Sequence, residues 1–157
     1  MWRWSYKNWK QPNKTTINNN NNQAEDCCNC PIPGRCTTQN VVYRAVVRRH
    51  NTYTIDCYTG LTWDKFKTRY IKHQSDIRTA SKLANLVWKL KQANVQHDVS
   101  WGIVARAPPF NPTTRVCRLC LTEAYHIMFT PGGANLNKRD ELFGFCKHRW
   151  KNLLWKK

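Results

Sequence analysis

Four metal ligands in the second half of the chain constrain its fold more than any other feature. Cys117 and Cys120 form a C-x-x-C pair, and Cys146 and His148 form a C-x-H pair further along the sequence. Three thiolates and one imidazole make a tetrahedral structural zinc set, which leaves no open position for a water molecule. We therefore predict a structural Zn²⁺ whose removal unfolds the C-terminal part, because metal affinity is coupled to folding.

A second group of cysteines stands upstream, and its pairing is open. We predict zinc ligation by Cys28, Cys30 and Cys36, completed by Cys27 or by a histidine. Disulfides are the alternative, since the chain has eight cysteines, an even number. Cys57 lies in an expected strand and is interpreted as an ordinary buried thiol.

The charge of the chain points to a polyanionic partner. The 157 residues contain 26 Lys and Arg against 9 Asp and Glu, a formal net charge of +17. Phosphate neutralisation by nucleic acid explains this excess directly, and a membrane surface is a weaker alternative because no basic amphipathic helix is visible. The sequence has no apolar run long enough to span a membrane and no secretory signal, which favours a reducing intracellular compartment.

The chain divides into three expected parts. Residues 1–26 form a basic, aromatic and Asn-rich tail, interpreted as a disordered leader or as an arm that stacks on the bases of a nucleic-acid strand. Residues 27–38 hold the upstream cysteines in a segment like a zinc knuckle. Residues 39–157 form the main domain with a basic tail.

Residue patterns in the main domain predict a small α+β fold. The β-branched run 41–47 and the alternating run 53–58 predict a hairpin that Gly60 closes, and Thr62 is expected to cap the next helix. Three prolines between 108 and 112 predict a loop. The other expected elements are a helix at 81–92, a strand at 99–105, a helix at 119–129 that stops before Pro131, and a basic helix around Trp150. Together they predict a three-stranded, mostly antiparallel sheet flanked by helices.

Polar residues at helical spacing suggest chemistry. Lys65, Arg69 and His73 fall on one helical face, which is either a solvated basic face or a surface that grips phosphate. Glu123 is a rare acidic residue within an apolar helix. It is either an ordinary surface residue or a ligand for a divalent cation at a phosphodiester.

In order along the chain, these residues resemble the core of the GIY-YIG nucleases. Val41-Val42-Tyr43 and Tyr58-Thr59-Gly60 stand for the two name-giving tripeptides, with both tyrosines and the glycine intact. The match is closer to one branch, the endonuclease domain of Penelope-like retroelements, over about residues 27–150. Its segments are Cys-Pro-Ile-Pro-Gly-Arg-Cys at 30–36, Val-Val-Tyr-Arg-Ala at 41–45, Gly-Leu-Thr at 60–62, Phe-Lys-Thr-Arg-Tyr at 66–70, Cys-Arg-Leu-Cys-Leu-Thr-Glu at 117–123, Leu-Asn-Lys-Arg-Asp-Glu-Leu at 136–142 and Cys-Lys-His-Arg at 146–149.

The resemblance implies hydrolysis of a DNA phosphodiester with Mg²⁺ or Mn²⁺. Glu123 would bind the cation, and Asn137 would orient the region around metal and phosphate. Contacts to DNA would come from basic residues near the site: Lys65, Arg69, Lys72, Lys138 and Arg139.

Four further residues receive roles from the same resemblance. Tyr43 would help activate the attacking water, directly or through a proton relay, and Tyr58 would position that water. Arg69 would stabilise charge on the phosphate in the transition state. His73 would assist proton transfer or contact the phosphate.

Three functional hypotheses follow. The first is an active metal-dependent endonuclease that nicks DNA in the nucleus to prime retroelement integration, with a reverse transcriptase supplied in cis or in trans. The second is a zinc-stabilised nucleic-acid-binding module without catalysis. The third is an extracellular disulfide-rich cationic protein.

Overall fold

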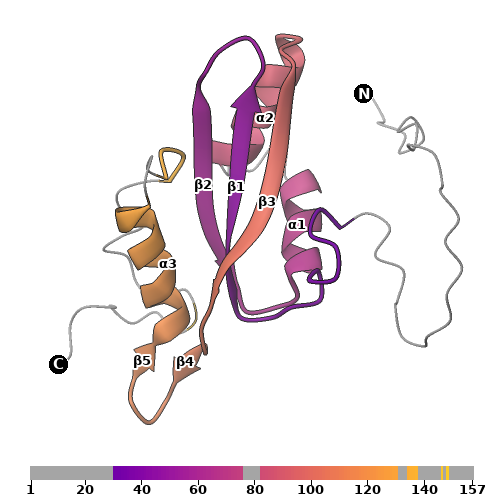
Figure 1. Ribbon diagram of the computed structural model, residues 1–157. Helices are drawn as coiled ribbons and strands as arrows, with labels where there is room; N and C mark the ends of the chain where they lie inside the picture. The colour runs from indigo at the N-terminus through magenta and orange to yellow at the C-terminus, as the bar shows by residue number, and fades with distance from the viewer. Residues whose placement is uncertain (1–29, 76–81, 131–133, 138–145, 147, 149–157) are drawn as a thin grey trace, which may run out of the picture.

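Three antiparallel strands form the central sheet of the computed structural model, which describes residues 30–75, 82–130, 134–137, 146 and 148. The strands are β1 (Val41–Arg49), β2 (Ile55–Thr62) and β3 (His97–Arg106), in the spatial order β2-β1-β3. The most apolar strand, β1, is central and pairs with both neighbours (Figure 1). The predicted α+β class with a three-stranded antiparallel sheet is confirmed.

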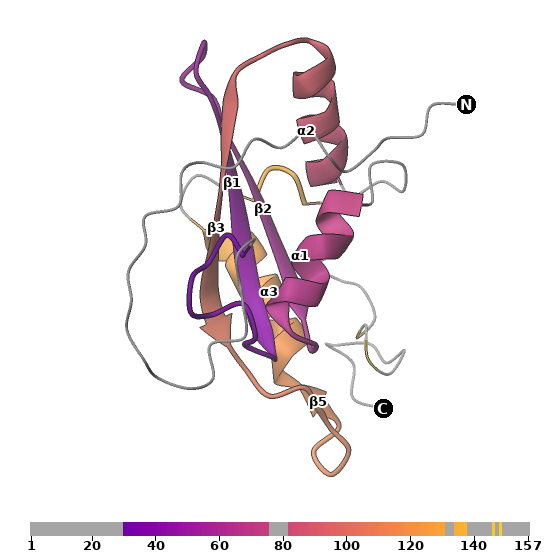
Figure 2. The same ribbon diagram turned by 90° about the vertical axis from the view of Figure 1, so that its right-hand side faces the viewer.

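Helices lie on both faces of this sheet. In chain order the remaining elements are α1 (Phe66–Ser75), α2 (Lys82–Gln92), the two-residue strands β4 (Phe110–Asn111) and β5 (Val116–Cys117), and α3 (Arg118–Phe129). Figure 2 shows α1 and α2 on one side of the sheet and α3 on the other. The described residues contain no helix that is both long and apolar enough to cross a membrane.

The alternation of side chains along β1 gives each layer its own core. Val41, Tyr43, Ala45 and Val47 face α1 and α2, where they pack with Phe66 and with two leucines of α2. Val42 points to the opposite face and packs against the start of α3. Because side chains alternate along a strand, one apolar run serves both layers.

Two expectations about the end of the hairpin are wrong. Gly60 does not close the hairpin, since β2 continues through it to Thr62 and Gly60 stands opposite Tyr43 in the register. Thr62 does not cap α1, because it belongs to β2 and the helix begins at Phe66. The first amides of α1 instead donate to the carbonyl oxygens of Cys36 and Thr38, in the loop before β1.

The other boundaries agree with expectation to within a few residues, apart from β4 and β5, which no pattern predicted. A register irregularity in the β1–β3 pairing falls between Val42 and Tyr43. Bulges of this kind re-aim neighbouring side chains, and this one lies at the tyrosine. The predicted tail at 1–26 and the basic helix around Trp150 lie outside the described residues.

Candidate functional site

Tyr43 is the centre of a polar cluster contributed by β1 and α1. Its side chain is 0% exposed, and its hydroxyl lies 2.7 Å from His73 Nε2. Arg69 Nε donates to the same hydroxyl oxygen at 3.1 Å. The helical spacing of Arg69 and His73 therefore brings both side chains to one tyrosine oxygen, as the shared-face prediction requires.

Tyr58 and Gly60 complete the cluster from β2. The Tyr58 ring centroid lies 6.4 Å from that of Tyr43 and 5.6 Å from that of His73. A Cβ atom added to Gly60 would stand 2.6 Å from the Tyr43 hydroxyl oxygen and 2.9 Å from a Tyr58 ring carbon. Glycine is needed at this position because the Tyr43 ring lies across the backbone of β2.

Burial governs the electrostatics of this cluster. Desolvation by burial, together with the nearby Tyr58, raises the pKa of Tyr43 well above its usual range. Burial alone would lower the pKa of Arg69, but its contacts with the Tyr43 and Tyr58 oxygens outweigh this effect and raise it. Tyr43 is thus a neutral phenol, and Arg69 carries a positive charge beside it.

Glu123 approaches the cluster from α3. The residue is only 5% exposed, and its charge is close enough to contribute to the raised pKa of Tyr43. The alternative of an ordinary surface carboxylate is therefore wrong. A single carboxylate fits the preference of Mg²⁺, which binds one or two protein carboxylates and takes its other oxygens from water and phosphate.

Asn137 lies at the outer edge of β2. Its Oδ1 accepts from the Thr59 amide at 2.8 Å, and its Nδ2 donates to the Thr59 carbonyl at 2.7 Å. Asn135 repeats the pattern, since its Oδ1 accepts from the Cys57 amide at 2.7 Å. Asn137 therefore holds the β2 backbone at the residue between Tyr58 and Gly60.

The four predicted zinc ligands come together at the start of α3. Ligand atoms of Cys117, Cys120, Cys146 and His148 all lie within 4.8 Å of one another. Cys120 Sγ and Cys146 Sγ are 3.8 Å apart, and His148 Nδ1 lies 3.2 Å from Cys117 Sγ and 3.4 Å from Cys120 Sγ. A tetrahedral zinc with Zn–S bonds of about 2.3 Å has S···S edges of about 3.8 Å, so this cluster could hold such a metal.

Two neighbours tie the metal cluster to the rest of the fold. Cys117 is the residue before α3 and Cys120 lies in its first turn, where helix amides favour thiolates. The Trp63 ring, just after β2, meets the His148 ring edge-on at a centroid distance of 4.7 Å. Burial raises the pKa of the Cys117 thiol, so metal binding there displaces a proton.

Among the cysteines upstream of the metal cluster, Cys36 differs from expectation. Cys36 is disulfide-bonded, and a disulfide sulfur carries no thiolate charge, so the prediction of Cys36 as a zinc ligand is wrong for this state. Cys30 is a free, half-buried thiol whose Sγ lies 3.4 Å from the Ile32 carbonyl oxygen. Cys28 lies outside the described residues. Cys57 is a buried free thiol, as interpreted from the sequence.

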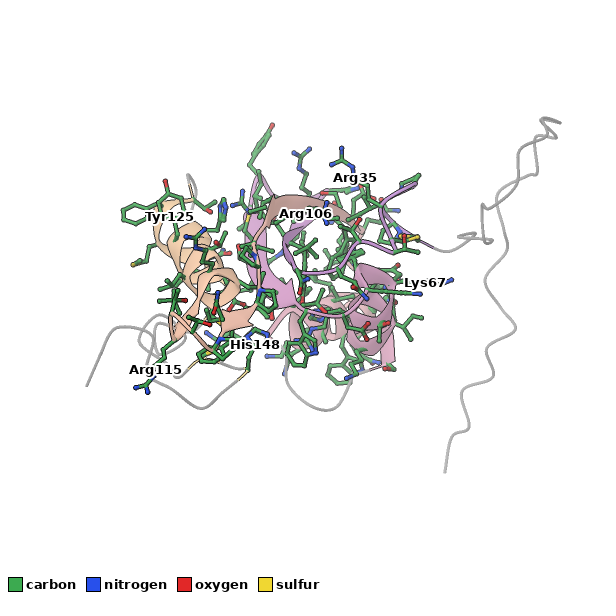
Figure 3. The ribbon with its side chains drawn as sticks, turned by 90° about the horizontal axis from the view of Figure 1, so that it is seen from below. Arg35, Lys67, Arg106, Arg115, Tyr125 and His148 are labelled. Carbon is green, nitrogen blue, oxygen red and sulfur yellow. The ribbon has the colours of Figure 1, made fainter. Side chains whose placement is uncertain are left out.

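The predicted DNA-contacting residues that the structure describes differ in exposure: the lysines are exposed, whereas Arg69 is hydrogen-bonded to Tyr43. Lys65 and Lys72 are exposed near the ends of α1, whereas Arg69 is half-buried. Lys138 and Arg139 lie outside the described residues. Other basic side chains extend outward from different sides of the domain, as Figure 3 shows for Lys67, Arg35 and Arg115.

Sequence reasoning missed Trp101 and Asn135. Trp101 of β3 packs against the His73 ring at 5.5 Å and the Tyr43 ring at 6.0 Å. Its alternation with Val99 and Ile103 could have placed it on the same sheet face as Tyr43. A hollow of about 430 Å³ lies elsewhere, around His50, Lys91 and Asp98, and no predicted catalytic residue lines it.

Comparison with known proteins gives no relative: no family model, no curated protein and no solved structure matches this chain.

Proposed function

We propose that the protein is a metal-dependent DNA endonuclease. The observation that carries the proposal is the contact of Arg69 and His73 with one buried tyrosine oxygen, with Tyr58 packed beside them. Cationic, proton-accepting and phenolic groups from three elements thus lie together in a strongly basic chain. The resemblance to GIY-YIG nucleases supports the same function.

His73 is the proton acceptor in this proposal. Tyr43 is wholly buried and its pKa is raised, so a resting tyrosinate is not available as a base. The Tyr43 hydroxyl and His73 Nε2 share one hydrogen bond of 2.7 Å, and a neutral imidazole held in this way would serve as the general base toward the attacking water. Tyr43 is then the positioning residue that orients the imidazole, much as a buried partner does in hydrolases.

Charge on the phosphate is balanced by Arg69 and Glu123 in different ways. Arg69 keeps its positive charge because the oxygens of Tyr43 and Tyr58 favour the charged guanidinium. This positive charge would stabilise the negative charge that develops on the phosphate in the transition state. Glu123 would hold Mg²⁺ or Mn²⁺, which neutralises phosphate charge when bound. The resemblance extends the proposal to nicking that primes reverse transcription in the nucleus, with a polymerase in cis or in trans.

The test is relaxation of supercoiled plasmid in Mg²⁺ or Mn²⁺. We expect nicking by the parent protein and a loss of about 100-fold or more in Glu123→Gln, a change that keeps the shape of the side chain. Asp98→Asn is the matched control, because Asp98 is an exposed carboxylate paired with His50. The control should nick like the parent.

Two outcomes would count against the proposal. Equal nicking by the parent and by Glu123→Gln would remove Glu123 from the chemistry. No nicking by any variant in either metal, with salt-sensitive DNA binding retained, would favour the non-catalytic nucleic-acid-binding module.

A further inference from the structure

A groove with two indole rings lies next to the tyrosine cluster. The cavity, of about 90 Å³, opens between the end of α1, one side of α2 and β3. Trp88 of α2 and Trp101 of β3 both line it, and Trp88 is 45% exposed. The rest of its apolar lining consists of short aliphatic side chains, among them Leu83, Ala84, Val87 and Val99.

This groove is continuous with the proposed catalytic cluster. His73 lines the groove, and the same side chain contacts the Tyr43 hydroxyl. The Trp101 ring lies 5.5 Å from the His73 ring and 6.0 Å from the Tyr43 ring. A group bound in the groove would therefore contact His73, the residue that we propose as the proton acceptor.

Polar groups of the groove suit a nucleotide. Gln74 and Lys91 line it together with His73, which places an amide and an ammonium group beside the indoles. An amide can pair with the edge of a base, and a lysine is a common partner of phosphate.

We infer that the groove receives one unpaired nucleobase of the DNA strand next to the scissile phosphate. This inference rests on the proposed function, and it narrows the substrate to DNA with an unstacked nucleotide at the cleavage site. Aromatic side chains bordered by cations are the means by which proteins hold single-stranded nucleic acid without reading its sequence. A fully paired base must first be unpaired and unstacked, so it reaches such a groove less readily than an unpaired base.

The experiment uses two duplex probes of the same sequence, one with a single unpaired 2-aminopurine and one with that base paired. Binding is measured without Mg²⁺ or Mn²⁺, so that cleavage plays no part. We expect Trp88→Ala to weaken binding of the unpaired probe by about 5- to 100-fold, with Trp88→Phe in between. Quenching of the 2-aminopurine should fall in parallel, whereas binding of the paired probe should not change.

Phe129→Ala is the matched control, because Phe129 is an aromatic residue that is 64% exposed on α3, across the sheet from α2. It should bind both probes like the parent. Equal binding of the unpaired probe by Trp88→Ala and the parent would overturn the inference, and so would an equal loss on both probes. If binding of the unpaired probe depends on Trp88 but the parent protein nicks no DNA, the proposed endonuclease activity is overturned. The inference that the groove receives an unpaired base is then still supported.

Discussion

At the scale of single residues, the cluster depends on how closely Tyr43 lies to the backbone of β2. The side chain has no exposed surface, so its position is set by neighbours on every side. Gly60 lies beneath the ring, while Arg69 and His73 hold the hydroxyl. Changes at any of these positions should therefore act through the tyrosine.

Gly60→Ala should disturb both stability and nicking. The new methyl group would lie 2.6 Å from the Tyr43 oxygen, so the ring must shift. We expect a loss of about 1–3 kcal/mol in the free energy of unfolding, measured by urea denaturation, and weaker nicking. Gly102→Ala is the control, because an added Cβ there meets no atom within 4 Å and should cost little. Equal effects of the two substitutions would contradict this account.

The raised pKa of Tyr43 predicts a specific alkaline response. Folding favours the neutral phenol, so its stabilising contribution is complete below a pH of about 10 and declines as the pH rises further. The stability difference between the parent and Tyr43→Phe should shrink by about 1.4 kcal/mol for each pH unit above that point. Urea unfolding at several alkaline pH values measures it. A constant difference would mean that Tyr43 ionises alike in both states.

At the scale of elements, the turn at 134–137 is bonded to the outer edge of β2. The Leu136 amide donates to the Cys57 carbonyl at 3.1 Å, between the bonds that Asn135 and Asn137 make. Backbone and side-chain amides together bond the outward-facing groups of Cys57 and Thr59, on either side of Tyr58. The position of Tyr58 thus depends on a segment far away in the sequence.

Asn137→Ala should loosen β2 at Thr59. The substitution removes the hydrogen bonds that the Asn137 side chain makes to the amide and to the carbonyl of Thr59. Thr59 is itself buried, so water does not readily replace these bonds. We expect a cost of about 1–3 kcal/mol and faster hydrogen exchange of the Thr59 amide. Asn85→Ala, at an exposed position of α2, is the control and should leave that exchange rate unchanged. Unchanged exchange in Asn137→Ala would show that the edge is held by other contacts.

Most of the elements could be predicted, but the details of the site could not. The apolar runs of β1 and α2 carry their own periodicity, so their types and approximate bounds follow from sequence alone. The continuation of β2 through Gly60 could not be predicted, because it depends on pairing with the first residues of β1, such as Val41 with Thr62. The backbone partner of Asn137 and the disulfide state of Cys36 likewise depend on distant segments.

At the scale of the whole molecule, the Cys/His cluster joins the start of α3 to positions 146 and 148. This link is the one part of the candidate site that ligand type and spacing predicted residue by residue. Since the ligands come from distant parts of the chain, a bound metal ion closes a large loop and contributes directly to folding.

Cys120→Ser should abolish metal binding and lower the melting temperature. Three remaining ligands do not complete a tetrahedral site, so we expect loss of bound zinc and a drop of about 10 °C or more. Metal analysis and thermal melts measure the two effects, and the tryptophan fluorescence of the protein should change because the Trp63 ring lies against His148. Cys57→Ala, a buried free thiol outside the cluster, should retain the metal. Zinc retained by Cys120→Ser would overturn the assignment.

The side-chain amides along β2 also bear on how molecules of this protein behave in a crowded solution. A bare outer strand is a template to which another chain can add, which is how many proteins begin to aggregate. Here the outward-facing groups of Cys57 and Thr59 are already bonded within the same molecule. Asn135 and Asn137 therefore leave fewer backbone groups at that border of the sheet to which a strand of another molecule could bond.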